Sequence, residues 1–292
     1  MGNGVRSVEG HVAGEALERL VTWGSTVPNF ERHHAADGLF VALGCCDEVS
    51  RARPDDLFLM ALNITFWFWV DDRSDKYLNA SVPQVNWPNL IAIAEDRSTQ
   101  QQSPEEAYLT ELADRMRKRC QFRGDFERWR ATAATSLGGM AWEDKISRKG
   151  VSPSYVESVE YGAASVTIVN IMHGAYIVNG THRAARQADE RLLQLERYVG
   201  LFQRLINDLY SVEKERKEGP NGRVSNAVIV MEQGMGRSAA KHFVEEQAKG
   251  CRRLINERLE ELGSADPAAR MTRNMLHAID AYYEHAPVRY IT

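Results

Sequence analysis

Apolar residues recur along this chain at the three-to-four-residue spacing of helices, and no segment alternates with a period of two for long enough to predict a strand. The spacing predicts long helices, for example over residues 54 to 78, 153 to 180 and 187 to 217. Ser103-Pro104 and Ser152-Pro153 each place a capping residue before a proline suited to the first helical position. The pattern predicts a single all-α domain over all 292 residues.

Composition narrows the class of protein. With 43% hydrophobic and 26% charged residues, the chain can bury a sizeable core, and its formal net charge of −4 argues against nucleic acid as the main partner. The longest apolar stretches, such as Gly38 to Cys46, are short for a membrane span, and the first residues lack the apolar core of a signal peptide. The four cysteines show no CxxC spacing, so we expect a cytoplasmic protein with free thiols.

An acidic cluster, Asp71-Asp72-Arg73-Ser74-Asp75, ends the first of these predicted helices. Asp71 and Asp75 are four residues apart and Asp72 and Asp75 three apart, so on a helix their carboxylates converge on about one face. By itself such a cluster is a weak signal, because most acid-rich helix ends are solvated surfaces.

A second polar row lies far along the chain, where Asn207, Ser211 and Glu215 follow one another at steps of four. That spacing aligns an amide oxygen, a hydroxyl and a carboxylate. Such hard oxygen ligands suit Mg²⁺, which usually completes its shell with water and substrate phosphates. Arg204 and Lys214 add positive charge about one turn away, which suits phosphate oxygens. The two clusters together predict a magnesium site that binds a phosphate ester.

Aromatic residues lead directly into the first acidic cluster, in the run Phe66-Trp67-Phe68-Trp69. Aromatic faces attract cations, so an aromatic pocket below a metal site could hold a carbocation that water would quench. The alternative is that these rings only fill the core.

Three segments rich in turn residues, 79 to 89, 217 to 223 and 285 to 292, are expected to be mobile. The first two directly follow the two polar clusters. If those clusters flank a pocket mouth, these segments begin at that mouth and are candidate lids.

In this order, the motifs resemble those of the class I terpene synthases, and the resemblance covers nearly the whole chain. It is carried by the Asp71 to Asp75 cluster, by the Asn207, Ser211 and Glu215 row with Lys214, and by Arg289-Tyr290 near the end of the chain. The resemblance implies a single α-helical bundle of the isoprenoid synthase type around a central apolar cavity.

The same resemblance implies roles for individual residues. Asp71 and Asp75 would hold two magnesium ions, with Asp72 in the same catalytic cluster, and the second row would hold a third ion. Arg204, Lys214, Arg289 and Tyr290 would grip the diphosphate when the lids close. The C–O bond would then break without a protein nucleophile, and the side chains expected to shape the cavity and stabilise cations are Trp67, Phe68, Trp142 and Tyr283.

Thr167 is a candidate for product control, because its hydroxyl dipole, or a water that it holds, could halt cyclisation or move a charge. The alternative is that this hydroxyl bonds a carbonyl of its own helix.

One departure from the family pattern bears on the substrate. Many bacterial members carry a diphosphate-sensing arginine one helix upstream of the metal row, and residues 157 to 170 contain none. Gly162, Ser165, Asn170 and Tyr282-Tyr283 look more like the compact bacterial diterpene synthases of the kaurene synthase kind. This resemblance implies a bicyclic copalyl-type diphosphate as substrate, with a separate class II cyclase as its source, and a homodimer is a further expectation.

The sequence fits other functions less well. A sesquiterpene cyclase acting on farnesyl diphosphate is the main alternative, and a chain-elongating prenyltransferase would be expected to carry a second DDxxD in place of the Asn207 row. A di-iron protein would need a partner for the ExxH at Glu31 to His34, and none is found, so His33 and His34 are expected at the surface. A helical adaptor would not explain the two polar rows. His173 is expected to be a core histidine with its hydrogen bonds satisfied.

Overall fold

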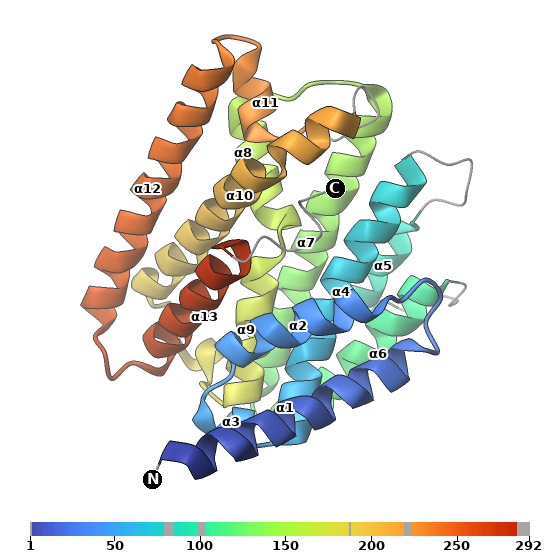
Figure 1. The fold of residues 1–292 in the computed structure, drawn as a ribbon, viewed down its shortest axis with the longest axis vertical. Coiled ribbons are helices and arrows are strands. Elements are labelled where there is room, and N and C mark those ends of the chain that lie inside the picture. Colours follow the sequence, from blue (N-terminus) through green and yellow to red (C-terminus); the bar gives the residue numbers. More distant parts are fainter. Residues whose placement is uncertain (1, 79–84, 98–102, 187, 219–223, 285–292) are drawn as a thin grey trace.

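The computed structural model describes residues 2–78, 85–97, 103–186, 188–218 and 224–284, and every regular element in these ranges is a helix (Figure 1). The expected all-α bundle is confirmed. The elements are α1 (Gly2–Gly24), α2 (Arg32–Cys45), α3 (Glu48–Arg51), α4 (Pro54–Leu78), α5 (Trp87–Ala94), α6 (Pro104–Arg119), α7 (Arg123–Lys149), α8 (Tyr155–Ser165), α9 (Ile168–Asn179), the 3₁₀ helix η1 (Arg183–Arg186), α10 (Glu190–Glu218), α11 (Ala227–Glu232), α12 (Arg237–Leu262) and α13 (Pro267–Glu284).

The packing of these helices places the two motif helices on opposite sides of the bundle core. The first acidic cluster lies on α4, which packs against α1 and α2, and the second polar row lies on α10, which packs against α8 and α12. Helix α9 contacts both α4 and α10 (Figure 1). The two polar rows therefore face a common interior.

Helix starts agree with the sequence in one case and differ in the other. The Ser103 hydroxyl accepts a hydrogen bond from the Glu106 N–H at 3.2 Å, as expected for the cap of α6. Helix α8 begins later than Ser152-Pro153 suggested, because Ser154 is its cap: the Ser154 hydroxyl accepts from the Glu157 N–H, and the Glu157 carboxylate accepts from the Ser154 N–H. This reciprocal capping box satisfies two helix-end donors at once.

The expected single helix over 153 to 180 is wrong, since the segment is split into α8 and α9. Thr167 has a φ of 61°, in the left-handed region that a β-branched residue rarely adopts. Gly139 on α7 lets the end of α8 approach closely: a Cβ on Gly139 would lie 2.6 Å from the Ser165 amide nitrogen. Tertiary packing, rather than local helix preference, thus sets the break.

By length and mean hydropathy alone, the stretch Tyr155–Asn179 could cross a membrane, although the sequence pattern had suggested no such segment. Of its most apolar window, 72% is buried inside the bundle. The break at Thr167 also interrupts it. We therefore interpret it as a core segment of the bundle.

Candidate active site

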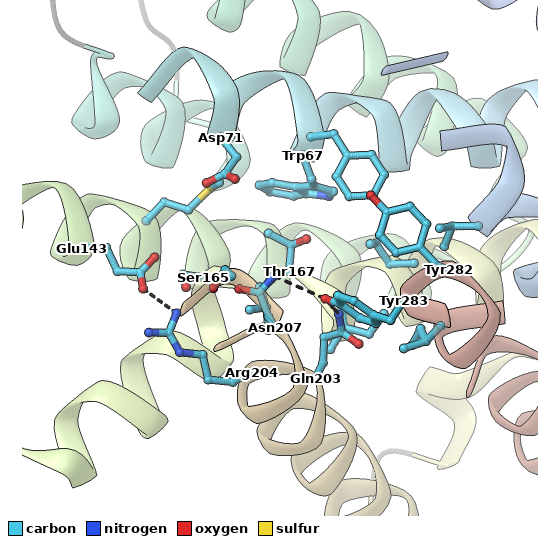
Figure 2. A pocket seen from close by; sticks show the side chains of 18 of the residues that line it. Trp67, Asp71, Glu143, Ser165, Thr167, Gln203, Arg204, Asn207, Tyr282 and Tyr283 are labelled. Atoms are coloured by element: carbon cyan, nitrogen blue, oxygen red, sulfur yellow. Dashed lines mark hydrogen bonds and ion pairs between the residues drawn. The ribbon is translucent and has the colours of Figure 1, made fainter. Parts of the chain in front are cut away.

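Both polar rows line one cavity, although they lie far apart in the chain. Asp71 and Asp75 line it from α4, and Asn207, Ser211 and Glu215 line it from α10. Figure 2 shows Asp71 and Asn207 on the two walls. The cavity has an empty volume of about 1080 Å³, counting the space at its open mouth. The convergence that the sequence reasoning required is therefore present.

Apart from Asp72, which does not line the cavity, the remaining site residues expected from the sequence fall into three groups. Those that line the same cavity are Trp67, Phe68, Thr167, Arg204, Lys214 and Tyr283. Trp142 does not line it: its ring stacks on the half-exposed Tyr161, with ring centroids 4.8 Å apart. Arg289 and Tyr290 lie outside the described residues.

The apolar floor of the cavity is held by a buried polar anchor. The Trp67 indole N–H donates to Asn170 Oδ1 at 3.0 Å, and Asn170 Nδ2 donates to the Trp129 carbonyl at 2.8 Å. Phe68 stacks on Tyr282, with ring planes 10° apart. Asn170 therefore fixes one aromatic face toward the interior, a role that the sequence did not reveal.

Only half of the aromatic run on α4 contributes to the cavity. Phe66 and Trp69 are fully buried elsewhere, where Phe66 packs edge-on against Tyr108 and the Trp69 indole donates to the Pro28 carbonyl. Phe66 and Trp69 therefore only fill the core, whereas Trp67 and Phe68 line the cavity, where the pocket interpretation places them.

The first acidic cluster has the donor chemistry of a magnesium site. One carboxylate oxygen from each of Asp71, Asp72 and Asp75 can be chosen so that all three lie within 4.8 Å of one another. Lys214 Nζ, from the opposite wall, lies 3.7 Å from Asp75 Oδ2. Clustered carboxylate oxygens next to a polar row of oxygens fit Mg²⁺ and do not fit a soft metal.

Hydrogen bonds along the cavity wall orient the first residue of the second row, Asn207. Asn207 Nδ2 donates to the Tyr283 hydroxyl at 3.3 Å, and Gln203 Nε2 donates to the same oxygen at 2.9 Å (Figure 2). The Asn207 amide is thereby turned with its nitrogen toward α13, which makes its oxygen the candidate ligand. Tyr283 thus acts on the metal row as well as on the cavity wall.

Ser211 has an equivalent partner in Asn226, which the sequence reasoning missed. Asn226 Nδ2 donates to Ser211 Oγ at 3.2 Å and to the Asp208 carbonyl at 3.0 Å. Its own side-chain oxygen caps α11 by accepting from the Val228 N–H at 2.9 Å. An asparagine before an apolar run is a recognisable cap signal, but the contact across to α10 leaves no trace in the sequence.

Arg204 is buried and already paired with the protein. Its Nη1 donates to Glu143 at 2.6 Å, its Nη2 donates to the Ser225 carbonyl at 2.6 Å, and its Nε lies 2.9 Å from Asp208 Oδ2. The Ser225 hydroxyl also donates to Glu143, at 2.8 Å. Helix α10 is thus tied to α7 and to the segment that carries Asn226. The expected contact of Arg204 with diphosphate stays a prediction.

Burial shifts the ionisation of this group. Burial is the largest cause that raises the pKa of Asp208 to about 8, with Arg204 opposing and Glu215 adding to the rise. Burial alone would lower the pKa of Arg204, but Asp208 and Glu143 raise it above its ordinary value. Arg204 and Asp208 therefore each offset part of the effect of burial on the pKa of the other.

The two histidines expected at the surface differ from each other. The side chain of His33 is 45% exposed, whereas that of His34 is 2% exposed and its Nε2 lies 3.0 Å from Asp72 Oδ2. The expectation is wrong for His34, because α2 packs its first turn directly against the acidic end of α4. His173 is buried as expected. The expectation that its hydrogen bonds are satisfied is not met, because among the described residues its Nδ1 has no hydrogen-bond partner, and its Nε2 lies 3.7 Å from Glu196.

Comparison with known protein families agrees with this geometry. The family described as "Terpene synthase family 2, C-terminal metal binding" matches residues 63–254, a range that contains both polar rows. The chain belongs to this terpene synthase family. It is therefore an enzyme of the terpene synthase class, a lyase from a metal-binding family.

Solved structures with the same fold include other terpene synthases. The linalool/nerolidol synthase of Streptomyces clavuligerus, in complex with 2-fluorogeranyl diphosphate, is 18% identical with a TM-score of 0.74, covering 94% of this chain and 93% of that one. The 2-methylisoborneol synthase of Streptomyces coelicolor A3(2), in complex with Mg²⁺ and 2-fluoroneryl diphosphate, is 18% identical with a TM-score of 0.75, covering 94% and 91%. At this identity, the likeness establishes the fold of the terpene synthase described here.

Proposed function

We propose that this terpene synthase ionises a prenyl diphosphate with the help of three magnesium ions, and that its substrate is a bicyclic copalyl-type diphosphate. The observation that carries the first part is the convergence of Asp71 and Asp75 with the Asn207, Ser211 and Glu215 row on one cavity. These five residues would hold the ions. When bound, Mg²⁺ supplies positive charge that stabilises the negative charge developing on the departing diphosphate.

Basic side chains at the mouth would hold the diphosphate oxygens. Lys214 is well placed, because its ammonium already joins the two walls through Asp75. Arg204 would contribute if it exchanged one of its protein partners for phosphate, and Arg289 and Tyr290 are proposed for the same role from the sequence alone. Charge-assisted bonds of this kind are about twice as strong as neutral ones.

The hydrocarbon would occupy the apolar part of the cavity. Trp67, held by Asn170, and Phe68, stacked on Tyr282, present aromatic faces that stabilise cations without reacting with them. Thr167 lies at the helix break that lines the cavity, and the described structure gives its side chain no helix-capping hydrogen bond. Its hydroxyl is the proposed site of product control.

One feature of the sequence supports the larger substrate. Residues 157 to 170 lack the arginine of many bacterial relatives, and Gly162 in that segment instead admits Arg204 from α10. A preceding class II cyclase reaction would have to supply such a bicyclic diphosphate.

A sesquiterpene cyclase acting on farnesyl diphosphate is the second candidate. It is supported by the name of one solved protein with the same fold, a linalool/nerolidol synthase, because nerolidol is a C15 alcohol. Chain elongation is less well supported, because the second row carries Asn207 and Ser211 where a second aspartate-rich motif would be expected.

Parallel incubations test the proposal. Farnesyl, geranylgeranyl and copalyl-type diphosphates are each supplied with Mg²⁺ or with EDTA, and products are identified by gas chromatography with mass spectrometry. We expect a hydrocarbon or alcohol from the copalyl-type substrate in Mg²⁺ alone. Turnover of the C15 substrate only would overturn the diterpene assignment, and longer prenyl diphosphates formed after adding isopentenyl diphosphate would indicate elongation. Magnesium-dependent turnover of none of them would refute the whole proposal.

A further inference from the structure

The middle carboxylate of the first acidic cluster is oriented differently from its neighbours. Asp71 and Asp75 line the cavity, whereas Asp72 is not among the described residues that line it. Asp72 Oδ2 instead lies 3.0 Å from His34 Nε2, at the first turn of α2. The cluster is thus divided between the cavity and a buried histidine.

The chemistry of the His34 ring identifies which partner donates. The Glu31 backbone N–H, which can only donate, points at His34 Nδ1 at 2.9 Å. Nδ1 must accept and so carries no proton, which places the proton of the neutral ring on Nε2. Nε2–H therefore donates to Asp72. The ring is held in this orientation by burial and by Phe30, whose centroid lies 5.6 Å away.

This tautomer argues against a metal site at the same place. His33, His34 and Asp72 can offer ligand atoms within 4.8 Å of one another, which is close enough to suggest a two-histidine, one-carboxylate centre. A metal on His34 Nε2 would require the ring proton to move to Nδ1, where it would oppose the Glu31 N–H. The contact between His34 and Asp72 is better explained as a hydrogen bond that orients a carboxylate.

We propose that His34 is a positioning residue for the magnesium site. As a neutral donor, it holds the Asp72 carboxylate in an orientation that lets the neighbouring Asp71 and Asp75 carboxylates bind metal together. This inference rests on the proposed function. Asp72 also belongs to the group of three carboxylates within 4.8 Å of one another, so its orientation sets the charge and shape of that group. Outer partners of this kind typically change metal affinity by about 10-fold to 100-fold when removed.

Two substitutions separate the two hydrogen bonds of His34. In His34→Asn the side-chain oxygen can replace Nδ1 and keep the Glu31 bond, but the side chain is too short to reach Asp72. In His34→Gln the terminal amide nitrogen can replace Nε2 and keep the Asp72 bond, while the Glu31 bond is lost. We expect His34→Asn to raise the half-saturating Mg²⁺ concentration about 10-fold or more, and His34→Gln to remain within about threefold of wild type. Conversely, His34→Gln loses the cap bond, so its Tm should lie about 2 °C below the Tm of His34→Asn.

Two readouts keep this inference separate from the proposed function. Steady-state turnover gives the Mg²⁺ requirement, and electron paramagnetic resonance gives Mn²⁺ binding in the presence of inorganic diphosphate without any turnover. His242→Asn, at an exposed histidine on α12, is the matched control and should match wild type in both. If wild type binds Mn²⁺ and His34→Asn binds it equally well, the proposed role of His34 is overturned but the proposed function is not affected. Parallel losses of Tm and metal binding in both variants would reduce His34 to a structural residue, and absence of Mn²⁺ binding in wild type would overturn both proposals.

Discussion

Gly162 lies inside α8, where alanine would ordinarily stabilise the helix, but Arg204 leaves no room for a methyl group. A Cβ at this position would lie 2.3 Å from Arg204 Nε, 2.5 Å from its Cζ and 2.6 Å from its Cδ. Ordinary contacts between such atoms are about 3.5 Å or more, so the guanidinium would have to move by about 1 Å. The movement cannot be absorbed freely, because Glu143 and the Ser225 carbonyl each hold the guanidinium at 2.6 Å.

The expected magnitude follows from these contacts. Losing one charge-assisted hydrogen bond costs about 1.5–3 kcal/mol, and the gain in helix propensity from Gly to Ala offsets about 0.5–1 kcal/mol. Gly162→Ala should therefore lower the free energy of unfolding by about 1–2 kcal/mol. Turnover should fall as well, because Arg204 lines the cavity and Ser225 adjoins the Asn226 that orients Ser211.

Denaturant-induced unfolding of purified variants measures this effect. Gly138→Ala is the matched control, since Gly138 lies inside α7 and an added Cβ there meets no described atom within 4 Å; it should stabilise the protein by about 0.5–1 kcal/mol. In an Arg204→Met background the penalty of Gly162→Ala should shrink, which a double-mutant cycle would show as coupling of about 0.5–3 kcal/mol. A Gly162→Ala variant as stable as Gly138→Ala would refute the reasoning.

Three further predictions concern the site and its support. Asp71→Ala should abolish Mg²⁺-dependent turnover, measured by product mass spectrometry, while the free energy of unfolding changes by no more than about 0.5 kcal/mol. An active variant would contradict the metal assignment. Asn170→Leu should leave a buried indole N–H without its acceptor, costing about 1–3 kcal/mol in denaturant unfolding and altering product ratios. Glu196→Ala should cost about 3–5 kcal/mol by stranding the fully buried Arg183. Burial would raise the pKa of Glu196, but His173 and Arg183 lower it overall. The stabilising effect of the Glu196 carboxylate should therefore be present above pH 4.5 and be lost as the pH falls through the folded-state pKa. Between pH 6 and 3, the free energy of unfolding should therefore decline less steeply in the variant than in wild type.

Local spacing was enough to predict which residues share a face. The steps of four in the second row, and the Asp71 to Asp75 step in the first, depend only on helix geometry, and the structure places these side chains on one cavity. That the two rows face each other could not be computed from spacing. It was inferred from the matching ligand chemistry of the two rows and from the resemblance to a family, because contact across many intervening helices depends on the whole fold.

Features that depend on packing between distant segments could not be predicted from the sequence. The left-handed Thr167 depends on the close approach of α8 to Gly139, and the rejection of Trp142 from the cavity depends on its stacking with Tyr161. The motif from Glu31 to His34 has the ExxH spacing of a metal-ligand pair, and without a second such pair the sequence predicts a surface position for its histidines. Those two residues do interact, but as a helix cap, and the unused ring nitrogen points to Asp72.

Hydrogen-bond partners on three different elements orient side chains of the two polar clusters. His34 on α2 donates to Asp72, and Asn226 at the start of α11 donates to Ser211. For Asn207 the direction is reversed, because its amide nitrogen donates to Tyr283 on α13 and its oxygen is thereby turned the other way. Each contact fixes an orientation that the spacing of the row leaves undetermined, since a helix sets where a side chain starts but not its terminal rotation. The affinity of the site should therefore depend on how α2, α11 and α13 pack against the two motif helices, even though none of these three supplies a proposed ligand.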